Sequence, residues 1–209
     1  MFDLLALITN KKFWLFHSWV IKNILKMRGI RVGKNFYIEG VPKLKIRGSP
    51  GNIRIGNDVS IFGGIDIRNR ENGKIIIEDG VAIDNDCRFV AANDAVLTIG
   101  KRTSIGSLGI FNCGTDVTIG EDCLISGMIF IQSSQHGFAK GELVRKQKHT
   151  YGKIVIGNDV WIAANAAIMK GVILEDGCVV GAKSLVRAGR YEKNSVLAGI
   201  PAVKVKERT

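Results

Sequence analysis

Aliphatic residues recur at every sixth position over most of this chain. Counting by six from Ile156, every position reached is aliphatic: Ile162, Ile168, Leu174, Val180 and Val186. Shorter runs with the same spacing begin at Val32, Ile55, Ile77, Ile99 and Ile119. A step of six residues walks around a 3.6-residue helical turn, so an amphipathic helix cannot produce this pattern. Self-similarity at a fixed short period instead predicts a repeat architecture.

A short sequence motif marks the start of several groups of repeats. Ile-Gly-Asn-Asp-Val occurs at 55–59 and again at 156–160, and Ile-Gly-Glu-Asp-Cys occurs at 119–123. We expect each unit of six to form a short strand with one aliphatic side chain inward, followed by a corner where Gly or Asn adopts a positive φ. Three units make one triangular turn, and successive turns stack about 4.8 Å apart as parallel strands.

The sequence therefore predicts an all-β solenoid, a parallel β-helix of about seven triangular coils. The coils are expected to begin near Val32, Ile55, Ile77, Ile99, Ile119, Ile156 and Leu174. One interval is longer than the others, because Ile119 and Ile156 are 37 residues apart (156 − 119). Removing one coil from this interval leaves one long inserted loop at 133–153. A long loop that interrupts a regular scaffold is usually functional.

Residues 1–30 precede the repeat and are predicted to form an amphipathic helix over 3–28. Its apolar stripe is expected to contain residues three and four apart: Phe13, Phe16, Val20, Ile24 and Met27. Lys22 and Lys26 would then face away. This helix either caps the open first coil or contacts a membrane surface, an alternative favoured by Trp14, Trp19 and the excess of Lys and Arg.

Residues 31–190 are assigned to the solenoid and residues 191–209 to a C-terminal basic tail. The N-terminal apolar run is broken by His17 and Ser18, so we expect neither a cleavable signal peptide nor a membrane-spanning helix. The four cysteines form no close pair, which favours reduced, packed thiols. The expected location is cytoplasmic, with the inner face of the membrane as one setting.

The formal net charge of +11 favours anionic partners: phosphorylated cofactors, anionic lipid or acidic sugars. The chain has no nucleic-acid-binding motif, so no nucleic-acid partner is expected. The inserted loop is itself basic, with Lys140, Arg145, Lys146, Lys148 and Lys153 against Glu142 alone. These residues form either a solvated surface or a patch for phosphates or an acidic sugar.

Two of the three histidines, His136 and His149, lie in the inserted loop. Imidazole changes its charge near neutral pH, so a loop histidine can take a proton from a hydroxyl and return it. His17 lies in the predicted helix and is interpreted as structural. A zinc site would need a third imidazole near the other two, so no metal is expected.

The motifs around the loop resemble those of the hexapeptide-repeat acyltransferases. They are the segment 119–126 leading to His136, the segment Tyr-Gly-Lys-Ile-Val-Ile-Gly-Asn-Asp-Val-Trp-Ile at 151–162, and the ending Ala-Gly-Ile-Pro-Ala at 198–202. The sequence is most similar to the maltose/galactoside acetyltransferase-like group, and within it to the polysaccharide O-acetyltransferase branch. The repeat covers most of the chain, whereas the first 30 residues carry no family motif.

This resemblance implies a left-handed β-helix, a homotrimer, and acetyl-CoA bound in clefts between subunits. His136 matches the catalytic histidine of the family, and Asn112 matches a polar residue on the acceptor side. Trp161 matches a tryptophan beside the active site. Further candidates are Lys140 and Arg145 for the acceptor, and Ala163, Ala182, Lys183, Lys204 and Lys206 for the cofactor. Val203 departs from the family, which often has a basic residue there, and no carboxylate is evident beside His136.

The sequence thus predicts an acetyl-CoA-dependent O-acetyltransferase acting on a sugar hydroxyl of a surface polysaccharide or its precursor. The expected acceptor is an anionic saccharide or a lipid-linked glycan. An N-acetyltransferase acting on an amino-sugar nucleotide and a non-catalytic β-helix scaffold remain the alternatives. A cysteine nucleophile, Cys113 or Cys123, is a weaker one, because both residues occupy packing positions of the repeat.

Overall fold

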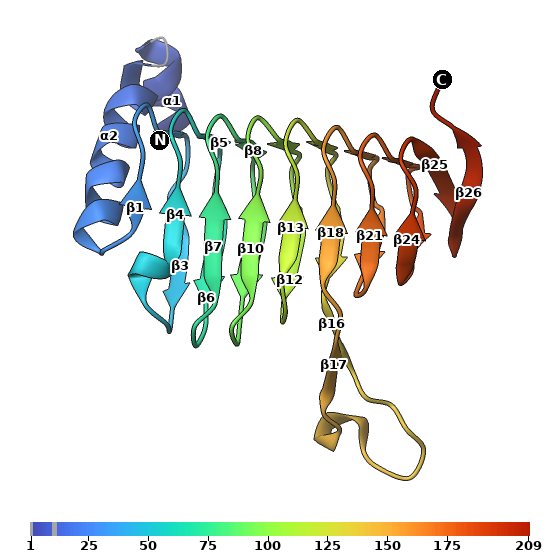
Figure 1. Cartoon of the computed structure of the whole chain (residues 1–209). Coiled ribbons are helices and arrows are strands. Elements are labelled where there is room, and N and C mark those ends of the chain that lie inside the picture. Colours follow the sequence, from blue (N-terminus) through green and yellow to red (C-terminus); the bar gives the residue numbers. More distant parts are fainter. Residues whose placement is uncertain (1, 10–11) are drawn as a thin grey trace.

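A computed structural model describes residues 2–9 and 12–209 of the chain. The chain winds into a triangular prism of stacked coils, with two helices at one end and a hairpin projecting from one edge (Figure 1). In Figure 1 the front strands rise and the chain then passes behind them as it advances, so the coils are left-handed. This hand is the exception among parallel crossover connections.

Three sheets, whose strands are parallel except for the last strand of the second, form the faces of the prism. The first face contains β1 (Arg31–Val32), β4 (Ile53–Ile55), β7 (Lys74–Ile77), β10 (Val96–Ile99), β13 (Val117–Ile119), β18 (Ile154–Ile156), β21 (Val172–Leu174) and β24 (Gly189–Tyr191). The second face contains β2 (Tyr37–Ile38), β5 (Ser60–Phe62), β8 (Ala82–Asp84), β11 (Ser104–Ile105), β14 (Leu124–Ile125), β19 (Trp161–Ile162), β22 (Val179–Val180), β25 (Ser195–Gly199) and β26 (Ala202–Glu207).

The third face contains β3 (Lys43–Ile46), β6 (Ile65–Asn69), β9 (Cys87–Ala91), β12 (Ile110–Cys113), β15 (Phe130–Gln132), β20 (Ala167–Met169) and β23 (Leu185–Val186). A short 3₁₀ turn, η1 (Pro50–Asn52), leads into β4. Seven coils therefore carry all three strands, and β24 with β25 adds two sides of an eighth. The prediction of about seven coils is confirmed.

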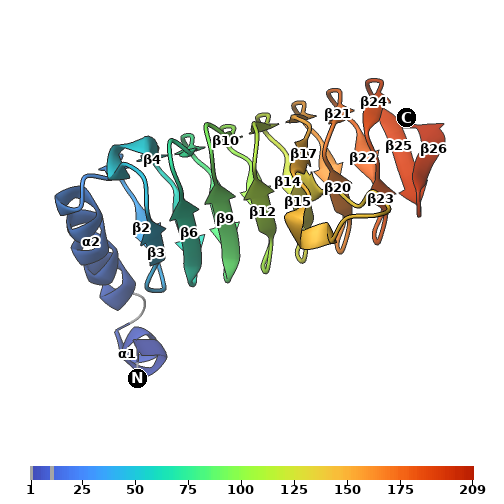
Figure 2. The ribbon, with the colours of Figure 1, turned by 90° about the horizontal axis from the view of Figure 1, so that it is seen from below.

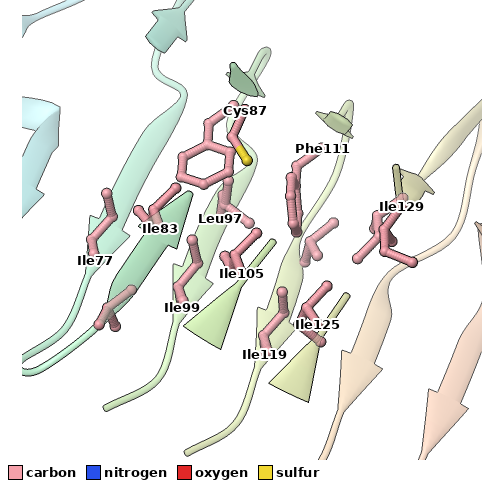
Figure 3. Packing of buried hydrophobic residues seen from close by; sticks show 14 of the residues in the cluster. Ile77, Ile83, Cys87, Leu97, Ile99, Ile105, Phe111, Ile119, Ile125 and Ile129 are labelled. Carbon is pink, nitrogen blue, oxygen red and sulfur yellow. The ribbon is translucent and has the colours of Figure 1, made fainter. Parts of the chain in front are cut away.

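The aliphatic positions spaced by six form continuous columns inside the prism. On the first face the paired residues are Val32, Ile55, Ile77, Ile99, Ile119, Ile156 and Leu174. Phe111 and Phe89 on the third face are fully buried and meet edge to face, with ring centroids 4.9 Å apart. Figure 3 shows part of this core, with Ile77, Ile99 and Ile119 in one column and Ile83, Ile105 and Ile125 in another. Such close contact of apolar side chains is the main stabilising feature of the fold.

The geometry of the corners explains why the repeated motif contains glycine. A Cβ on Gly120 would lie 2.5 Å from the carbonyl oxygen of Gly157 in the next coil, so the close stacking of coils requires glycine here. The positive φ falls two residues later, at Asp122 (58°) and Asp159 (52°). Glycine is therefore needed for the close approach of backbones, whereas Asp or Asn adopts the left-handed conformation.

The N-terminal segment forms two helices, α1 (Phe2–Ile8) and α2 (Lys12–Met27). The side chains of α2 that face the first coil are Trp14, Ser18, Ile21 and Leu25. The predicted stripe is therefore wrong: Phe16, Ile24 and Met27 are exposed. Apolar residues nearly surround this helix, so spacing alone did not identify the buried side.

Ser18 accounts for the side that is buried. Its Oγ accepts a hydrogen bond from the Ile38 backbone N–H at 2.8 Å, and this small residue lets the helix approach the edge of the coil. Helix α2 thus covers the open end of the first coil. None of the helices in the part of the chain that the structure describes is long and apolar enough to cross a bilayer.

The segment expected as a basic tail contains ordered strands. Strand β25 stacks in parallel on β22 and continues the solenoid. Strand β26 turns back and pairs with β25 in the antiparallel direction, so it covers the last edge of the second face.

Candidate functional site

The inserted segment forms a β-hairpin at the edge between the third and first faces (Figure 1). Its strands are β16 (Ser134–His136) and β17 (His149–Tyr151), which pair in the antiparallel direction. The tip contains a single turn of 3₁₀ helix, η2 (Val144–Lys146). The hairpin follows β15 directly, so the coil that contains β15 positions the first strand of the hairpin.

Ser133 holds the base of the hairpin against the preceding coil. Its buried Oγ accepts hydrogen bonds from the backbone N–H groups of Gly114 (3.0 Å) and Thr115 (3.1 Å) and donates one to the Thr115 carbonyl (2.8 Å). On the other strand, Lys153 forms an ion pair with Asp116 at 2.8 Å. Both strands of the hairpin are thus tied to the same corner of one coil.

Gln147 shapes the tip of the hairpin. Its side-chain amide accepts a hydrogen bond from the Ala139 N–H and donates to the carbonyl oxygens of Ala139 and Glu142. The acceptor candidates Lys140 and Arg145 lie on this tip and are exposed. They are not among the residues that line the cavity described below.

His136 and His149 face each other across the hairpin. They form a directly opposed pair in the strand register, and His149 Nε2 lies 3.0 Å from His136 Nε2 and 3.1 Å from its Nδ1. The ring centroids are 4.0 Å apart and the rings are nearly perpendicular. In such a contact one nitrogen donates and the other accepts, so a proton held by one imidazole lies within reach of the other.

A cavity of about 380 Å³ lies beside the histidine pair, on the third face. Gln132 and Asn112 line it next to the histidines, and the Asn112 amide donates to the Gln132 side-chain oxygen at 3.4 Å. Gln132 in turn donates to the Ser134 carbonyl at 2.9 Å. The sequence candidates His136 and Asn112 therefore share one cavity.

Trp161 lies on a different face of the prism. It belongs to β19 on the second face, is about half exposed, and its Nε1–H points to Ser126 Oγ at 3.4 Å. Ala163 lies at the corner that follows, and the Lys183 N–H donates to the carbonyl of Ala164 at the same corner. The cofactor candidates Ala182 and Lys183 are exposed there.

Lys204 and Lys206 lie on β26, at the end of the same second face. Lys204 forms an ion pair with Glu207 at 2.8 Å. One chain therefore gathers the cofactor candidates on the second face and its edge, and His136 with Asn112 on the third face and the opposite edge. It does not bring the two groups into one cavity.

All four cysteines are buried and unpaired. Burial raises the pKa of the Cys87 thiol to about 11 and raises the pKa of Cys113 still further. Cys113 adjoins the cavity, but its thiol remains protonated at neutral pH and is a poor nucleophile. This environment is that of packing residues.

Sequence reasoning missed the contact between His149 and His136. Ser133 and Gly152 close the base of the hairpin through a backbone hydrogen bond of 3.0 Å, and each histidine is three residues inside that base. The sequence held a signal for this contact, because two residues equally far from the two ends of a hairpin face each other across its strands. Sequence reasoning also missed three arginines, Arg68, Arg70 and Arg88, which line the same cavity from neighbouring coils.

Comparison with known proteins agrees with this architecture. Residues 153–188 match the family model described as bacterial transferase hexapeptide (six repeats). WbbJ of Escherichia coli strain K12, provisionally described as a lipopolysaccharide biosynthesis O-acetyl transferase, is 37% identical over 99 residues. That match covers 44% of this chain and 50% of WbbJ, so the chain spans about half the length of the curated relatives it matches.

Two solved structures share the fold. The polysialic acid O-acetyltransferase OatWY superposes with a TM-score of 0.58 at 22% identity, covering 85% of this chain and 87% of that one. The N-acyltransferase AntD from Bacillus cereus, in complex with dTDP and 3-hydroxybutyryl-CoA, gives 0.55 at 24% identity, covering 90% and 88%. The repeat, the family model over residues 153–188 and the acetyltransferase relatives together show that this chain is similar to the hexapeptide-repeat acyltransferases.

Proposed function

We propose that this protein transfers an acetyl group from acetyl-CoA to a sugar hydroxyl of a surface polysaccharide or its precursor. The observation that carries the proposal is His136, held beside a polar cavity by a hairpin that Ser133 ties to the solenoid. The name of WbbJ, an O-acetyl transferase of lipopolysaccharide biosynthesis, supports the acceptor class. The acyl-CoA bound by AntD supports the donor.

The transfer is direct, without an acyl-enzyme. An imidazole nitrogen of His136 takes the proton of the sugar hydroxyl as its oxygen attacks the thioester carbonyl carbon. The new C–O bond forms, the C–S bond breaks, and the proton passes from His136 to the sulfur of the departing CoA. A backbone N–H of a neighbouring coil stabilises the oxyanion. His149 Nε2 lies within hydrogen-bond distance of either His136 nitrogen. When it accepts the N–H of one of them, it orients the imidazole in the place of a carboxylate and leaves the other nitrogen free to take the proton.

We propose further that the working unit is a homotrimer with acetyl-CoA bound between subunits. The separation of the candidates within one chain supports this arrangement, because Trp161 and His136 lie on different faces of the prism. A neighbouring copy can bring its second face to the hairpin of the first and so complete one site from two half-sites. Sedimentation equilibrium tests the trimer, and a monomer with full activity would refute the shared site.

The test is His136→Ala in a purified-protein assay that follows release of free CoA. We expect a loss of about 10²–10⁴-fold in kcat, the usual contribution of one acid–base group, with the oligomeric state unchanged. Thr150→Ala is the matched control, because Thr150 lies on the same hairpin but does not line the cavity. If His136→Ala retained near-full activity, the assignment would be wrong.

The same assay separates hydroxyl from amino acceptors. AntD is an N-acyltransferase with this fold, so an amino-sugar nucleotide is included as a competing acceptor. Preference for a hydroxyl-bearing saccharide supports O-transfer. Turnover with the amino-sugar nucleotide alone would show that the protein is an N-acetyltransferase and not an O-acetyltransferase. Failure of the protein to bind CoA would favour a non-catalytic scaffold.

A further inference from the structure

The outward side chains of the third face form rows that lead toward the histidine pair. One row runs through the paired residues Lys45, Arg68, Val90, Asn112 and Gln132. The next row runs through Lys43, Asp66, Arg88 and Ile110. Successive residues in a row lie one coil apart, about 4.8 Å, so the first row carries cations on coils one and two and amides on coils four and five.

Arg68 and Arg88 of these rows, and Arg70 just beyond the end of β6, line the cavity that His136 adjoins. Arg68 binds the Asp66 carboxylate through two nitrogens, and this contact holds the pKa of Asp66 below its usual range. Arg88 is about half exposed and reaches Asp66 through Nε alone, at 3.3 Å. Among the described residues Arg70, which is exposed, makes no ion pair. Arg70 and Arg88 therefore present guanidinium groups to the cavity, while Arg68 and Asp66 satisfy one another.

Charge along this face favours an anionic ligand. Glu71 lines the same cavity, and its carboxylate already accepts the Asn93 N–H at 2.9 Å. Asp66 is paired with Arg68 and Arg88, and Asp86 lines a neighbouring cavity with Arg88. Lys43 and Lys45 add positive charge on the first coil. Planar guanidinium groups suit carboxylates, which they bind through paired N–H···O bonds. The cations are spread over several coils, as recognition of a chain of repeating acidic units requires.

We propose that Arg70 and Arg88 bind carboxylate groups of an acidic saccharide whose neighbouring unit presents its hydroxyl to His136. The proposal rests on the acetyl transfer proposed above and names its acceptor: a saccharide of carboxylated sugars, bound along the third face. Asn112 and Gln132 lie between the arginines and the histidines and hydrogen-bond the uncharged part of the same chain.

The test compares Arg70→Ala, Arg88→Ala and the double variant with the wild type. The acceptors are a carboxylated oligosaccharide and the same oligosaccharide after chemical reduction of its carboxyl groups. We expect KM for the carboxylated acceptor to rise about tenfold or more for each variant, as for loss of a charged hydrogen bond. The kcat/KM for the reduced acceptor stays unchanged. Arg54→Ala is the control, because Arg54 is a half-exposed arginine on the first face.

Direct binding separates this proposal from the proposed function. Calorimetry with His136→Ala measures affinity for the carboxylated oligosaccharide without turnover, and the affinity should fall as NaCl is added. If the arginine variants weaken both acceptors equally, or leave binding of the carboxylated one unchanged, the arginine site is refuted even where acetyl transfer is established. If binding depends on the arginines but no hydroxyl is acetylated, the proposed function fails instead.

The two helices at the N-terminal end of the prism expose many apolar side chains. Helix α1 projects beyond the body of the prism (Figure 2), and the side of α2 that faces away from the coil carries exposed apolar residues beside Lys12, Asn23 and Lys26. The exposed residues of the two helices are Leu4, Leu5, Leu7, Ile8, Leu15, Phe16, Trp19, Ile24 and Met27. Phe16 and Trp19 stack with ring centroids 6.0 Å apart, and each is more than 60% exposed. A patch of this kind marks an interaction site.

The charge around this patch identifies the partner. Residues 4–38 contain seven Lys or Arg residues and no Asp or Glu. We infer that the exposed side of α1 and α2 lies on an anionic membrane surface, with Trp19 and Phe16 entering the headgroup region and Lys12, Lys22 and Lys26 near the lipid phosphates. This location would bring the enzyme to acceptors assembled on lipid.

Co-sedimentation with vesicles tests the inference. We expect the protein to bind vesicles of equal parts phosphatidylglycerol and phosphatidylcholine, and to bind pure phosphatidylcholine far less. Trp19→Glu should lower the partition coefficient on the order of tenfold, whereas Val205→Glu, at the opposite end of the solenoid, should not. Equal binding to both vesicles, or a change in oligomeric state with Trp19→Glu and none in vesicle binding, would refute it and favour packing between copies.

Discussion

Removal of the Ser133 hydroxyl should loosen the candidate active site without unfolding the solenoid. Ser133→Ala leaves two backbone N–H groups, of Gly114 and Thr115, without their acceptor and breaks the bond to the Thr115 carbonyl. A hydrogen bond contributes about 1 kcal/mol net, and an unsatisfied buried group costs about 1–3 kcal/mol. Both N–H groups lie at a half-buried corner that water reaches in part, so we expect a local loss of about 2–4 kcal/mol.

Hydrogen exchange followed by mass spectrometry measures this loss where it occurs. Peptides covering 112–118 and 133–152 should exchange on the order of 30- to 1,000-fold faster in Ser133→Ala, which is the same free energy expressed as an opening equilibrium. Peptides from coils one to three should not change. The turnover number should fall in parallel, because the hairpin then holds His136 less firmly. Ser104→Ala, a half-buried serine on β11, serves as the control.

Two results would contradict this reasoning. Exchange at 133–152 that matches the wild type would mean that the neighbouring coil holds the hairpin without the serine. Faster exchange with unchanged turnover would mean that binding of the acceptor, and not Ser133, positions the histidines.

Three further predictions test the scaffold. Gly120→Ala should lower the melting temperature by several degrees, because the new Cβ would lie 2.5 Å from the Gly157 oxygen, and an unchanged melting temperature would contradict the stacking role of this glycine. Iodoacetamide at pH 8 should label native Cys87 only slowly, since burial raises its thiol pKa to about 11, and rapid labelling would contradict that burial. Lys153 lowers the pKa of Asp116, so stabilisation by their ion pair is present above the ordinary carboxyl pKa of about 3.9 and is lost as pH falls through the lowered value. The melting temperature should therefore drop more below about pH 4 in the wild type than in Asp116→Asn, and equal drops would contradict the contribution of the pair.

The repeat was predictable because it is a local property. The place of a residue in its unit of six decides whether its side chain points inward, and the same position recurs in every coil. The local spacing alone therefore predicts that Ile119 and Ile156 stack on one another. The insertion was predictable for the same reason, because it makes one interval between repeats longer than the others. The motifs around it then identified His136 as the candidate base.

The composition of α2 illustrates where this reasoning failed. A helix with apolar residues on most of its surface satisfies several three-and-four spacings, and only the edge of the first coil selects among them. Ser18 faces the coil because a small side chain with a hydroxyl can accept the Ile38 N–H at the edge of the first coil. No periodicity of hydrophobic residues reports such a contact.

The sequence by itself determined the solenoid, the number of its coils and the place where the regularity ends. Only the tertiary structure decided which outward residues meet, because the coil lengths and corner geometries set the register between side chains that are distant in sequence. It paired His149 with His136 across the hairpin and gathered Arg68, Arg70 and Arg88 into the same cavity. It also put Trp161 on another face, since three flat sides of a prism diverge and one chain cannot bring all of them to one site.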